Sequence, residues 1–481
     1  MSLTGALMNA FSGLRANSRA ATIVSTNISN ATTEGYGRRD LALTAGVVGT
    51  YGGVRVDGVL RHVDPAVLAD RRVSDAGLGQ STDLLTYASR VEAAVGLLGD
   101  LGSLPQMVTA FENTLVSAAA NPASTQRLEA VSYAADAVAQ KLNGLSEDLQ
   151  LARLEADGSI ARHVDLLNEN LQRVDALNDD IVAASTTGSD VSSLLDERQR
   201  LIDGIADLVP LRVVQRDLGA VSLFSTGGAM LLDGGAPAQI GFAATNAVTA
   251  DMTHDAGDLS GLSLNGIAIN SGANGMFAGG RIAAMFAIRD DLAVRDQASL
   301  DAIARDLAER LGPGGPDATL VAGDPGLFTD GGLAFDPVNE IGFAGRISLN
   351  ALAQGTGVWR IRDGLGAAVP GNVGDASLVT AIADALTTPS VPSSANLPPV
   401  ARSFANQVAD FSSGVAGARL REENTSAYLA AQNTALRERE LTTGVDTDQE
   451  LQRLMQIEQH YAANAQVMSV VDDLMERLLA I

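Results

Sequence analysis

The feature that most constrains this chain is a heptad spacing of apolar residues at both of its ends. Near the N-terminus the spaced positions are Leu3, Leu7, Ala10, Leu14, Asn17, Ala21, Val24 and Ile28. Near the C-terminus they are Leu454, Ile457, Tyr461, Asn464, Met468, Val471, Met475 and Leu478. Each stretch alternates steps of four and three residues and contains one polar Asn. Each therefore predicts one helix with a coiled-coil seam.

The two predicted helices are expected to pair with each other and with further copies of the chain. An ordinary amphipathic helix on a core is the alternative, but residues 1–33 carry only two charged side chains, Arg15 and Arg19. Burial of about a dozen apolar side chains offers roughly 25 kcal/mol, which the conformational entropy of about sixty ordered residues offsets. The termini are therefore expected to be mobile in the monomer and helical in an assembly. Aligned antiparallel helices would place Asn17 opposite Asn464, although either Asn could face a neighbouring subunit.

Between the ends, the pattern predicts a mainly α chain with β-rich insertions, an α+β organisation. Residues 1–40 and 444–481 are expected to form a terminal coiled-coil domain. Residues 41–209, 280–311 and 400–443 are expected to form a helical bundle, with a β-leaning stretch at 41–60. Gly and Asp turns between short apolar runs predict a β-rich module at 210–279 and an inserted, variable α/β or β domain at 312–399.

Composition excludes several classes of function. A net charge of −24 opposes binding to nucleic acid and to anionic membranes, and no apolar stretch reaches the length of a membrane span. The chain has no cysteine, which excludes disulfides and Cys-ligated metals. The N-terminus lacks the cationic start and cleavage site of a secretory signal. We therefore expect a cytoplasmic protein or one exported without a cleaved leader.

No catalytic or metal-binding arrangement stands out. The four histidines lie far apart, at His62, His163, His254 and His460. Asp324, Asp330 and Asp336 could ligate calcium, but their spacing is not that of an EF-hand, and turn formation is the favoured interpretation. The local signatures of P-loops, nucleophile elbows and zincins do not occur. We expect no enzymatic activity and no cofactor.

The segment TNISNATTEGYGRR, residues 26–39, resembles the N-terminal signature of bacterial flagellar rod, hook and hook-associated proteins. Glu34 stands where that family usually has Pro. The matching residues are Asn27, Ile28, Asn30, Thr33, Gly35, Tyr36 and Arg38. The C-terminal run resembles the other half of this signature through Gly444, Val445, Asp448, Glu450, Leu454, Tyr461, Ala463, Asn464, Ala465 and Met468. Together the two ends indicate an axial subunit of the flagellum.

Three interior segments resemble, within that family, the hook-filament junction proteins, which are the first hook-associated proteins. They are residues 111–150, 192–214 and 279–292. The resemblance implies a ring of identical subunits between hook and filament, located outside the cell. Implied partners are further copies of the chain, the hook protein, a second junction protein, filament subunits, a cytoplasmic export chaperone and the type III export apparatus.

The same resemblance implies that the terminal helices surround a central channel. The C-terminal helix, with Glu450, Glu458, Asp472, Asp473 and Glu476, would meet channel water. The implied assembly residues at the N-terminus are Leu3, Leu7, Leu14, Asn17, Val24, Asn27, Ile28, Asn30, Gly35, Tyr36 and Arg38. Those at the C-terminus, which a chaperone would also cover, are Leu454, Ile457, Tyr461, Asn464, Met468, Val471, Met475 and Leu478.

Three other functions stay open at this point. A hook or rod subunit would share both terminal signatures. A secreted hydrolase could use the acidic segment 312–399 on an extracellular polymer, although only scattered carboxylates favour it. A surface adhesin or immune target could be built on the same scaffold.

Overall fold

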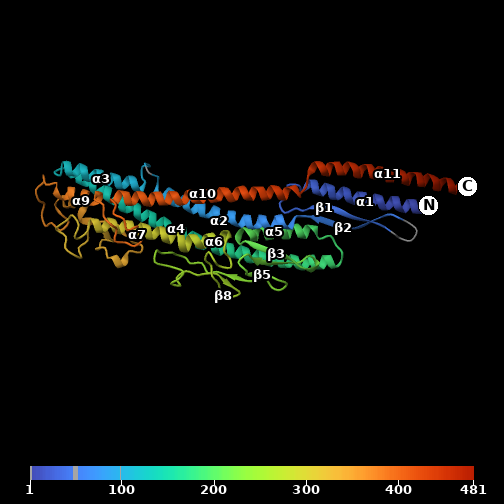
Figure 1. Ribbon diagram of the computed structural model, residues 1–481, viewed down its shortest axis with the longest axis horizontal. Helices are drawn as coiled ribbons and strands as arrows, with labels where there is room; N and C mark the ends of the chain where they lie inside the picture. Colours follow the sequence, from blue (N-terminus) through green and yellow to red (C-terminus); the bar gives the residue numbers. More distant parts are fainter. Residues whose placement is uncertain (1–2, 47–51, 98, 481) are drawn as a thin grey trace.

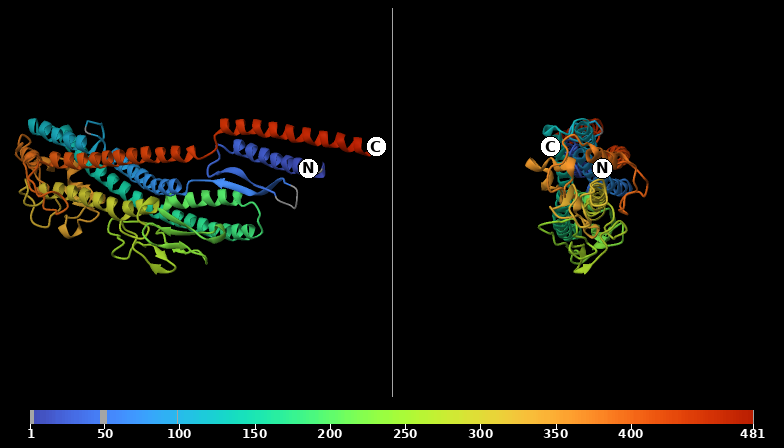
Figure 2. Two further views of the ribbon diagram at one scale, coloured as in Figure 1. Left: turned by 45° about the vertical axis from the view of Figure 1, so that its right-hand side comes forward. Right: turned by 90° about the vertical axis from the view of Figure 1, so that its left-hand side faces the viewer.

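The computed structural model describes residues 3–46, 52–97 and 99–480, which form a long, mainly helical molecule (Figure 1). Both termini lie at one end of the long axis, and the segment 312–399 lies at the other end (Figures 1 and 2). Small antiparallel sheets are attached along the helices. This arrangement confirms the predicted class of an α-rich fold with β insertions.

The chain ends form an antiparallel helix pair. Helix α1 (Leu3–Ser29) packs against α11 (Thr447–Leu479). The bounds of α1 follow the predicted heptad spacing, whereas α11 begins seven residues before the first predicted heptad position, Leu454. Asp446 caps α11 by accepting from the backbone N–H groups of Asp448 and Gln449. Strands β1 (Arg38–Ala45) and β2 (Val54–His62) form a hairpin that also packs on α1.

The body is a bundle of long helices. They are α2 (Pro65–Val95), α3 (Leu104–Ala120), α4 (Thr125–Thr186), α5 (Ser192–Leu208), α6 (Gly280–Phe286), α7 (Ala293–Arg310) and α10 (Phe404–Thr442). Ser124 caps α4, and Asp64 caps α2. A π-helical segment, Ala287–Leu292, joins α6 to α7. Helix α2 runs along α10, and α3 packs on α4.

The predicted β module at 210–279 contains two three-stranded sheets in the described part of the chain. The first is made of β3 (Leu211–Gln215), β4 (Val221–Ser225) and β5 (Met230–Leu232). The second is made of β6 (Ile240–Gly241), β7 (Ser263–Leu264) and β8 (Ile267–Ala268). The buried side chains of the β module share one apolar cluster with α5, α6 and the C-terminal half of α4.

The inserted segment 312–399 contains short elements: β9 (Phe328–Asp330), β10 (Ile347–Leu349), α8 (Arg360–Asp363) and α9 (Ser377–Thr387). Its buried residues belong to the same apolar cluster as α3, α4, α7 and α10. Phe328 of β9 meets Phe111 of α3 edge to face, with ring centroids 6.1 Å apart. The predicted insertion boundary therefore marks a change of secondary structure and not a separate hydrophobic core.

Candidate assembly surface

The contact between α1 and α11 is made mainly by small residues of α1. Ala10, Gly13, Ala16 and Val24 are buried in it. A Cβ atom at Gly13 would lie only 2.8 Å from Nδ2 of Asn464, so the two helices approach as closely as a glycine allows. The larger predicted seam residues Leu3, Leu7, Leu14, Asn17 and Ile28 flank this line and are half-buried.

The register of the pair differs from the expected one. Asn464 lies against Gly13, one helical turn from Asn17 along α1. The same register places Asn17 level with His460, so the expected alignment of Asn17 with Asn464 is not formed. The reason is that contacts at the inner end of the pair, between Asn27 and Glu450, fix the register. The register is not set by alignment of the two chain ends.

On α11, part of the predicted seam faces α1. Val471 is buried, and Leu454, Ile457, Asn464 and Met468 are half-buried. Tyr461, Met475 and Leu478 remain 49%, 44% and 58% exposed, respectively. The seam is therefore only partly covered within one chain.

The N-terminal signature converges on the side chain of Asn27, which is fully buried. Its Nδ2 donates to the carbonyl of Arg39 at 2.9 Å and to Oε2 of Glu450 at 3.1 Å. Its Oδ1 accepts from the Tyr36 hydroxyl at 2.8 Å and from the Arg39 N–H at 3.0 Å. One amide thus uses its donors and acceptors to join α1, the turn after it, β1 and α11.

Glu450 supplies the counterpart from the C-terminal signature. Its side chain is 1% exposed, and Oε1 accepts from Nε of Arg38 at 2.9 Å. The expectation that Glu450 meets channel water is therefore wrong within this chain, because its carboxylate is consumed by Asn27 and Arg38. Arg453 forms a further ion pair with Asp40 beside it. We call Asn27, Tyr36, Arg38 and Glu450 the signature cluster.

The turn between α1 and β1 depends on Gly35. Its φ of +77° lies in the left-handed region, and a Cβ there would come within 2.6 Å of Cγ of Arg200. Asn30 closes the end of α1 by donating to the carbonyl of Thr26 at 2.9 Å. Burial raises the pKa of the Tyr36 hydroxyl, which keeps it protonated as a donor to Asn27.

Sequence reasoning missed the residue that ties the signature turn to the body, Asp196 of α5. Its Oδ1 accepts from the Gly37 N–H at 3.0 Å and from Nε of Arg61 at 2.7 Å, and its Oδ2 pairs with Arg39 at 2.5 Å. Asp196 lies in the segment 192–214, which resembles the hook-filament junction proteins, but no spacing links it to a hairpin more than a hundred residues earlier.

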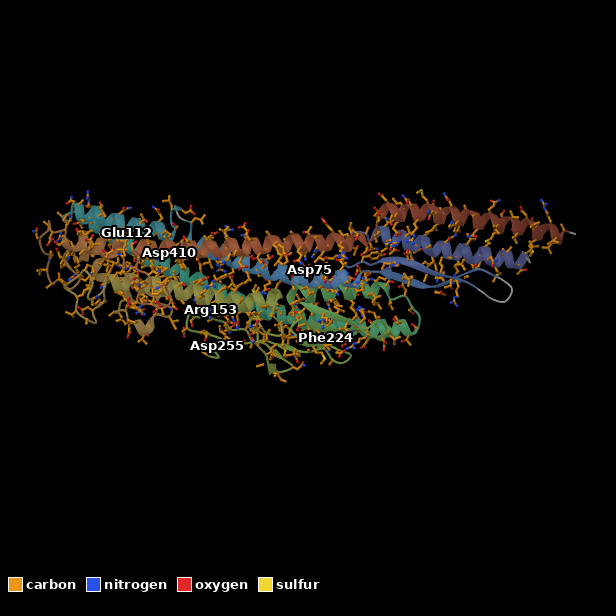
Figure 3. All side chains as sticks on the ribbon, in the orientation of Figure 1. Asp75, Glu112, Arg153, Phe224, Asp255 and Asp410 are labelled. Atoms are coloured by element: carbon orange, nitrogen blue, oxygen red, sulfur yellow. The ribbon has the colours of Figure 1, made fainter. Side chains whose placement is uncertain are left out.

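A second group of charges joins the end of α10 to the body. Arg71 of α2 contacts Asp75 at 2.9 Å, Asp203 of α5 at 2.5 Å and Glu440 of α10 at 2.7 Å. Asn433 of α10 donates to Asp75 at 2.7 Å. Figure 3 shows Asp75 where α2 runs beside α10. Both connections of the terminal pair to the body are thus built from buried charges.

Another side of α11 is apolar in the C-terminal half of the helix. We call it the outer apolar surface, and its residues are Val467, Val470, Leu474 and Leu478, each at least 44% exposed. On α1, Met8 and Phe11 are 59% and 56% exposed. Asp472, Asp473 and Glu476 lie on an exposed acidic side of the same helix. Large exposed apolar areas of this kind mark sites of protein association.

The residues considered for chemistry have structural roles. Asp330 pairs with Arg346 at 2.8 Å, while Asp324 and Asp336 accept from the backbone N–H groups of Val321 and Val338. Within residues 3–46, 52–97 and 99–480, no group of three or more His, Asp or Glu side chains is placed to hold a metal ion. Among the same residues, no helix combines the length and apolar character that a bilayer crossing requires.

Two families match parts of the chain. Residues 88–312 match the helical domain of the flagellar hook-associated protein FlgK, and residues 441–481 match the C-terminal region of the flagellar basal body rod FlgEFG proteins. The second match covers α11, and the first covers most of the helical body together with the β module.

Several curated proteins similar to this chain are named flagellar hook-associated protein 1. Flagellar hook-associated protein 1 of Salmonella typhimurium is 29% identical over 251 residues, which cover 50% of this chain and 44% of that protein. The Escherichia coli protein of that name is 27% identical over 250 residues, covering 50% and 45%, and the Bacillus subtilis protein 25% over 235 residues, covering 46% of each. The chain thus spans about half the length of the curated relatives it matches.

The solved structure of the flagellar hook junction protein FlgK from Burkholderia pseudomallei is 20% identical. It aligns over 55% of this chain and 47% of its own, with a TM-score of 0.44. The two family matches and the named relatives agree with the terminal signatures and with the prediction of a structural protein instead of an enzyme. The chain is thus similar to the flagellar hook-associated protein FlgK over residues 88–312 and to the flagellar rod proteins over residues 441–481.

Proposed function

We propose that this protein is a structural subunit of the ring that joins the flagellar hook to the filament, and that it assembles through its terminal helix pair. The observation that carries the proposal is the outer apolar surface of α11, which stays exposed although the other side of the helix already contacts α1. The match to the FlgK helical domain supports the junction in preference to the rod or the hook.

The energetics favour contacts with further copies. Each large side chain of the outer apolar surface would contribute about 1 kcal/mol or more on burial of its exposed half. Four such residues supply several kcal/mol, which is the scale needed to hold a marginal helix pair in place. Neighbouring subunits would therefore complete a fold that one chain leaves partly uncovered. The acidic side with Asp472, Asp473 and Glu476 would then face water in a channel.

The body would carry the load between hook and filament. The signature cluster and Asp196 fix the terminal pair to α5, and Arg71 fixes α10 to α2 and α5. A subunit joined at two points can pass a displacement of its terminal helices to the body without loss of register. Such a subunit suits an adaptor between two tubes of different stiffness.

Export and protection before assembly follow from the same surface. A chain with the outer apolar surface of α11 exposed would associate prematurely in the cytoplasm. We propose that a cytoplasmic export chaperone covers α11 and that the type III apparatus passes the unfolded chain to the outside of the cell. The absence of cysteine is compatible with such passage, because no disulfide can lock the chain beforehand.

Electron microscopy of a deletion strain tests the proposal. The junction role predicts completed hooks without filaments, with filaments restored by the wild-type chain. Absence of hooks would instead indicate a rod or hook subunit. A strain that makes normal filaments would contradict both roles.

Matched variants test the surface itself. Leu474→Glu, on the outer apolar surface, should prevent complementation, whereas Ser469→Glu, which adds the same charge on the acidic side, should complement. Both variants must keep the same helix content by circular dichroism. Equal behaviour of the two would show that the outer apolar surface is not an assembly contact.

A further inference from the structure

A small cavity lies where the hairpin, the body and the β module meet. It has a volume of about 140 Å³, whereas a single water molecule needs about 15 Å³. Its walls come from the end of β2, the start of α2, the middle of α5, and strands β3 and β4. Three arginines line it: Arg61 of β2, Arg72 of α2 and Arg198 of α5. We call it the basic cavity.

Each of the two carboxylates next to the basic cavity pairs with two arginines, one of which, Arg71, also contacts Asp75 and Glu440. Asp196 pairs with both Arg39 and Arg61, each through a contact of at most 2.7 Å. Asp203 likewise pairs with both Arg71 and Arg72, at 2.5 and 2.6 Å. No Asp or Glu is among the described residues that line the cavity itself. The cavity is therefore positive, in a chain whose net charge is −24.

Arg198 carries the excess charge. It is only 5% exposed and has no ion pair within the described parts of the chain. Its Nη1 donates to Oδ1 of Asn178 at 2.9 Å and to the carbonyl of Gly219 at 2.7 Å, both of which are neutral. Burial, with the nearby charges of Arg61 and Arg72, lowers the pKa of Arg198 to about 10. A buried cation without a counter-charge is costly, and an anion would offset that cost.

The three guanidinium groups have donors to spare. Arg72 uses Nε for Asp203, and Arg198 uses only Nη1 for protein acceptors. Arg61 uses Nε and Nη2, for Asp196, Gly35 and Gln199. The planar fork of a guanidinium matches the oxygens of phosphate groups, and several forks around one cavity suit a tetrahedral anion.

We propose that the basic cavity binds a small tetrahedral oxyanion of the phosphate class, held by Arg61, Arg72 and Arg198. The anion would link β2 to α2 and α5, and so stiffen the joint between the terminal helices and the body. This site is independent of the hook-filament role, because it rests on the cavity and its charges alone.

Thermal unfolding of the full chain with inorganic phosphate tests the site, with sodium chloride at equal ionic strength as the reference. A bound anion at one hundred times its Kd lowers the unfolded fraction about 100-fold, so the Tm should rise with the logarithm of the phosphate concentration, by about 2 °C or more at that concentration. Hydrogen exchange in residues 54–62 should slow in parallel. The absence of any rise in Tm beyond that of the chloride reference would overturn the proposal.

Three variants test whether the basic cavity is the site at which phosphate raises the Tm. Arg198→Met should abolish the response to phosphate, whereas Arg212→Met, an exposed arginine on β3, should keep it. Ala69→Glu places a carboxylate at the wall of the basic cavity, and it should raise the Tm without phosphate while removing the response. This variant keeps all three arginines, so it decides the question even if Arg198→Met does not fold. A full phosphate response in Ala69→Glu would place the anion elsewhere and refute the site.

Discussion

Asn27 and Glu450 are 423 residues apart in the chain and share a buried hydrogen bond of 3.1 Å. The bond joins the two halves of the terminal signature directly, and it sets the register of α1 against α11. Neither residue lies on the predicted heptad seam. The register of the terminal helix pair is therefore set by a polar contact at its inner end. The apolar seam contributes buried surface but does not select the register.

Asn27→Ala should destabilise the terminal pair by about 2–4 kcal/mol. The change leaves the Tyr36 hydroxyl and the Arg39 N–H without this acceptor, and it removes the amide donor from Oε2 of Glu450, whose Oε1 keeps Arg38. Urea unfolding followed by hydrogen exchange in α1 and α11 measures the loss. Asn17→Ala, on the half-buried flank of α1, is the matched control and should cost less than about 1 kcal/mol.

Gly13→Val should separate α1 from α11. A Cβ at this position meets the Asn464 side chain at 2.8 Å, so the larger residue should cost about 1–3 kcal/mol through overpacking. Asn464→Ala removes the obstructing amide and should recover part of the loss in the double variant. If the two changes add independently, Gly13 and Asn464 are not in contact.

Asp157→Ala should destabilise the body by about 3–5 kcal/mol. Asp157 and Arg289 are both buried and pair at 2.5 Å, and removal of the carboxylate leaves Arg289 with only the half-buried Asp290 as a counter-charge. The matched control is Glu169→Ala on the same helix, whose pair with Arg173 is exposed and should cost below about 0.5 kcal/mol. Similar losses for both changes would contradict the assigned role of burial.

Asp301 should make stability depend on pH between about 4 and 6. Burial raises the pKa of this carboxyl from 3.8 to about 6, against the opposing effect of hydrogen bonds from the N–H groups of Gly342 and Ala344. The folded chain holds the proton more tightly than the unfolded chain, so this contribution is present at low pH and is lost as pH rises through 6.

The size of the effect is about 3 kcal/mol for the shift of roughly two pKa units. Urea unfolding of the wild type and of Asp301→Asn from pH 4 to pH 7 isolates it, because the other carboxyl groups titrate in both proteins. The wild type should lose stability relative to the variant as pH rises. Parallel curves would show that Asp301 titrates in the folded chain as it does in the unfolded one.

Hydrogen exchange should be graded along the terminal pair in the monomer. Residues 3–16 should exchange fast, because Leu3 and Leu7 are only half-buried. The α11 seam residues Tyr461, Met475 and Leu478 also remain exposed. Residues 24–40 should be protected by the signature cluster. Uniform strong protection from residue 3 onward would mean that the pair needs no neighbours.

Periodicity predicted the long helices well, since an apolar residue at every third or fourth position leaves few alternatives. Helix α4 illustrates this, since the break at Asn121-Pro122 and the N-cap Ser124 are local signals that precede its start at Thr125. The same pattern could not give the register of α1 and α11. A seam of similar apolar residues tolerates shifts of one turn, and the residues that choose the register, Asn27 and Glu450, lie outside it.

The contacts of Asp196 and Arg198 were also beyond sequence reasoning. Their partners come from α4, β1, β2 and the loop before β4, and their roles depend on which charges become buried together. A lone Asp or Arg on a helix carries no periodic or motif signal. The positions of the helices can therefore be predicted from the local sequence. The contacts that connect one element to another depend on which residues the folded chain brings together.

The pairing of α1 with α11 also dictates an order of events. The body can close through contacts between neighbouring helices such as α3 and α4, but α1 finds its partner only when the last 35 or so residues are present. A chain that stops short of Thr447 would build a folded body and leave its first helix single. The register contact between Asn27 and Glu450 thus makes the pairing of the first helix conditional on the synthesis of α11.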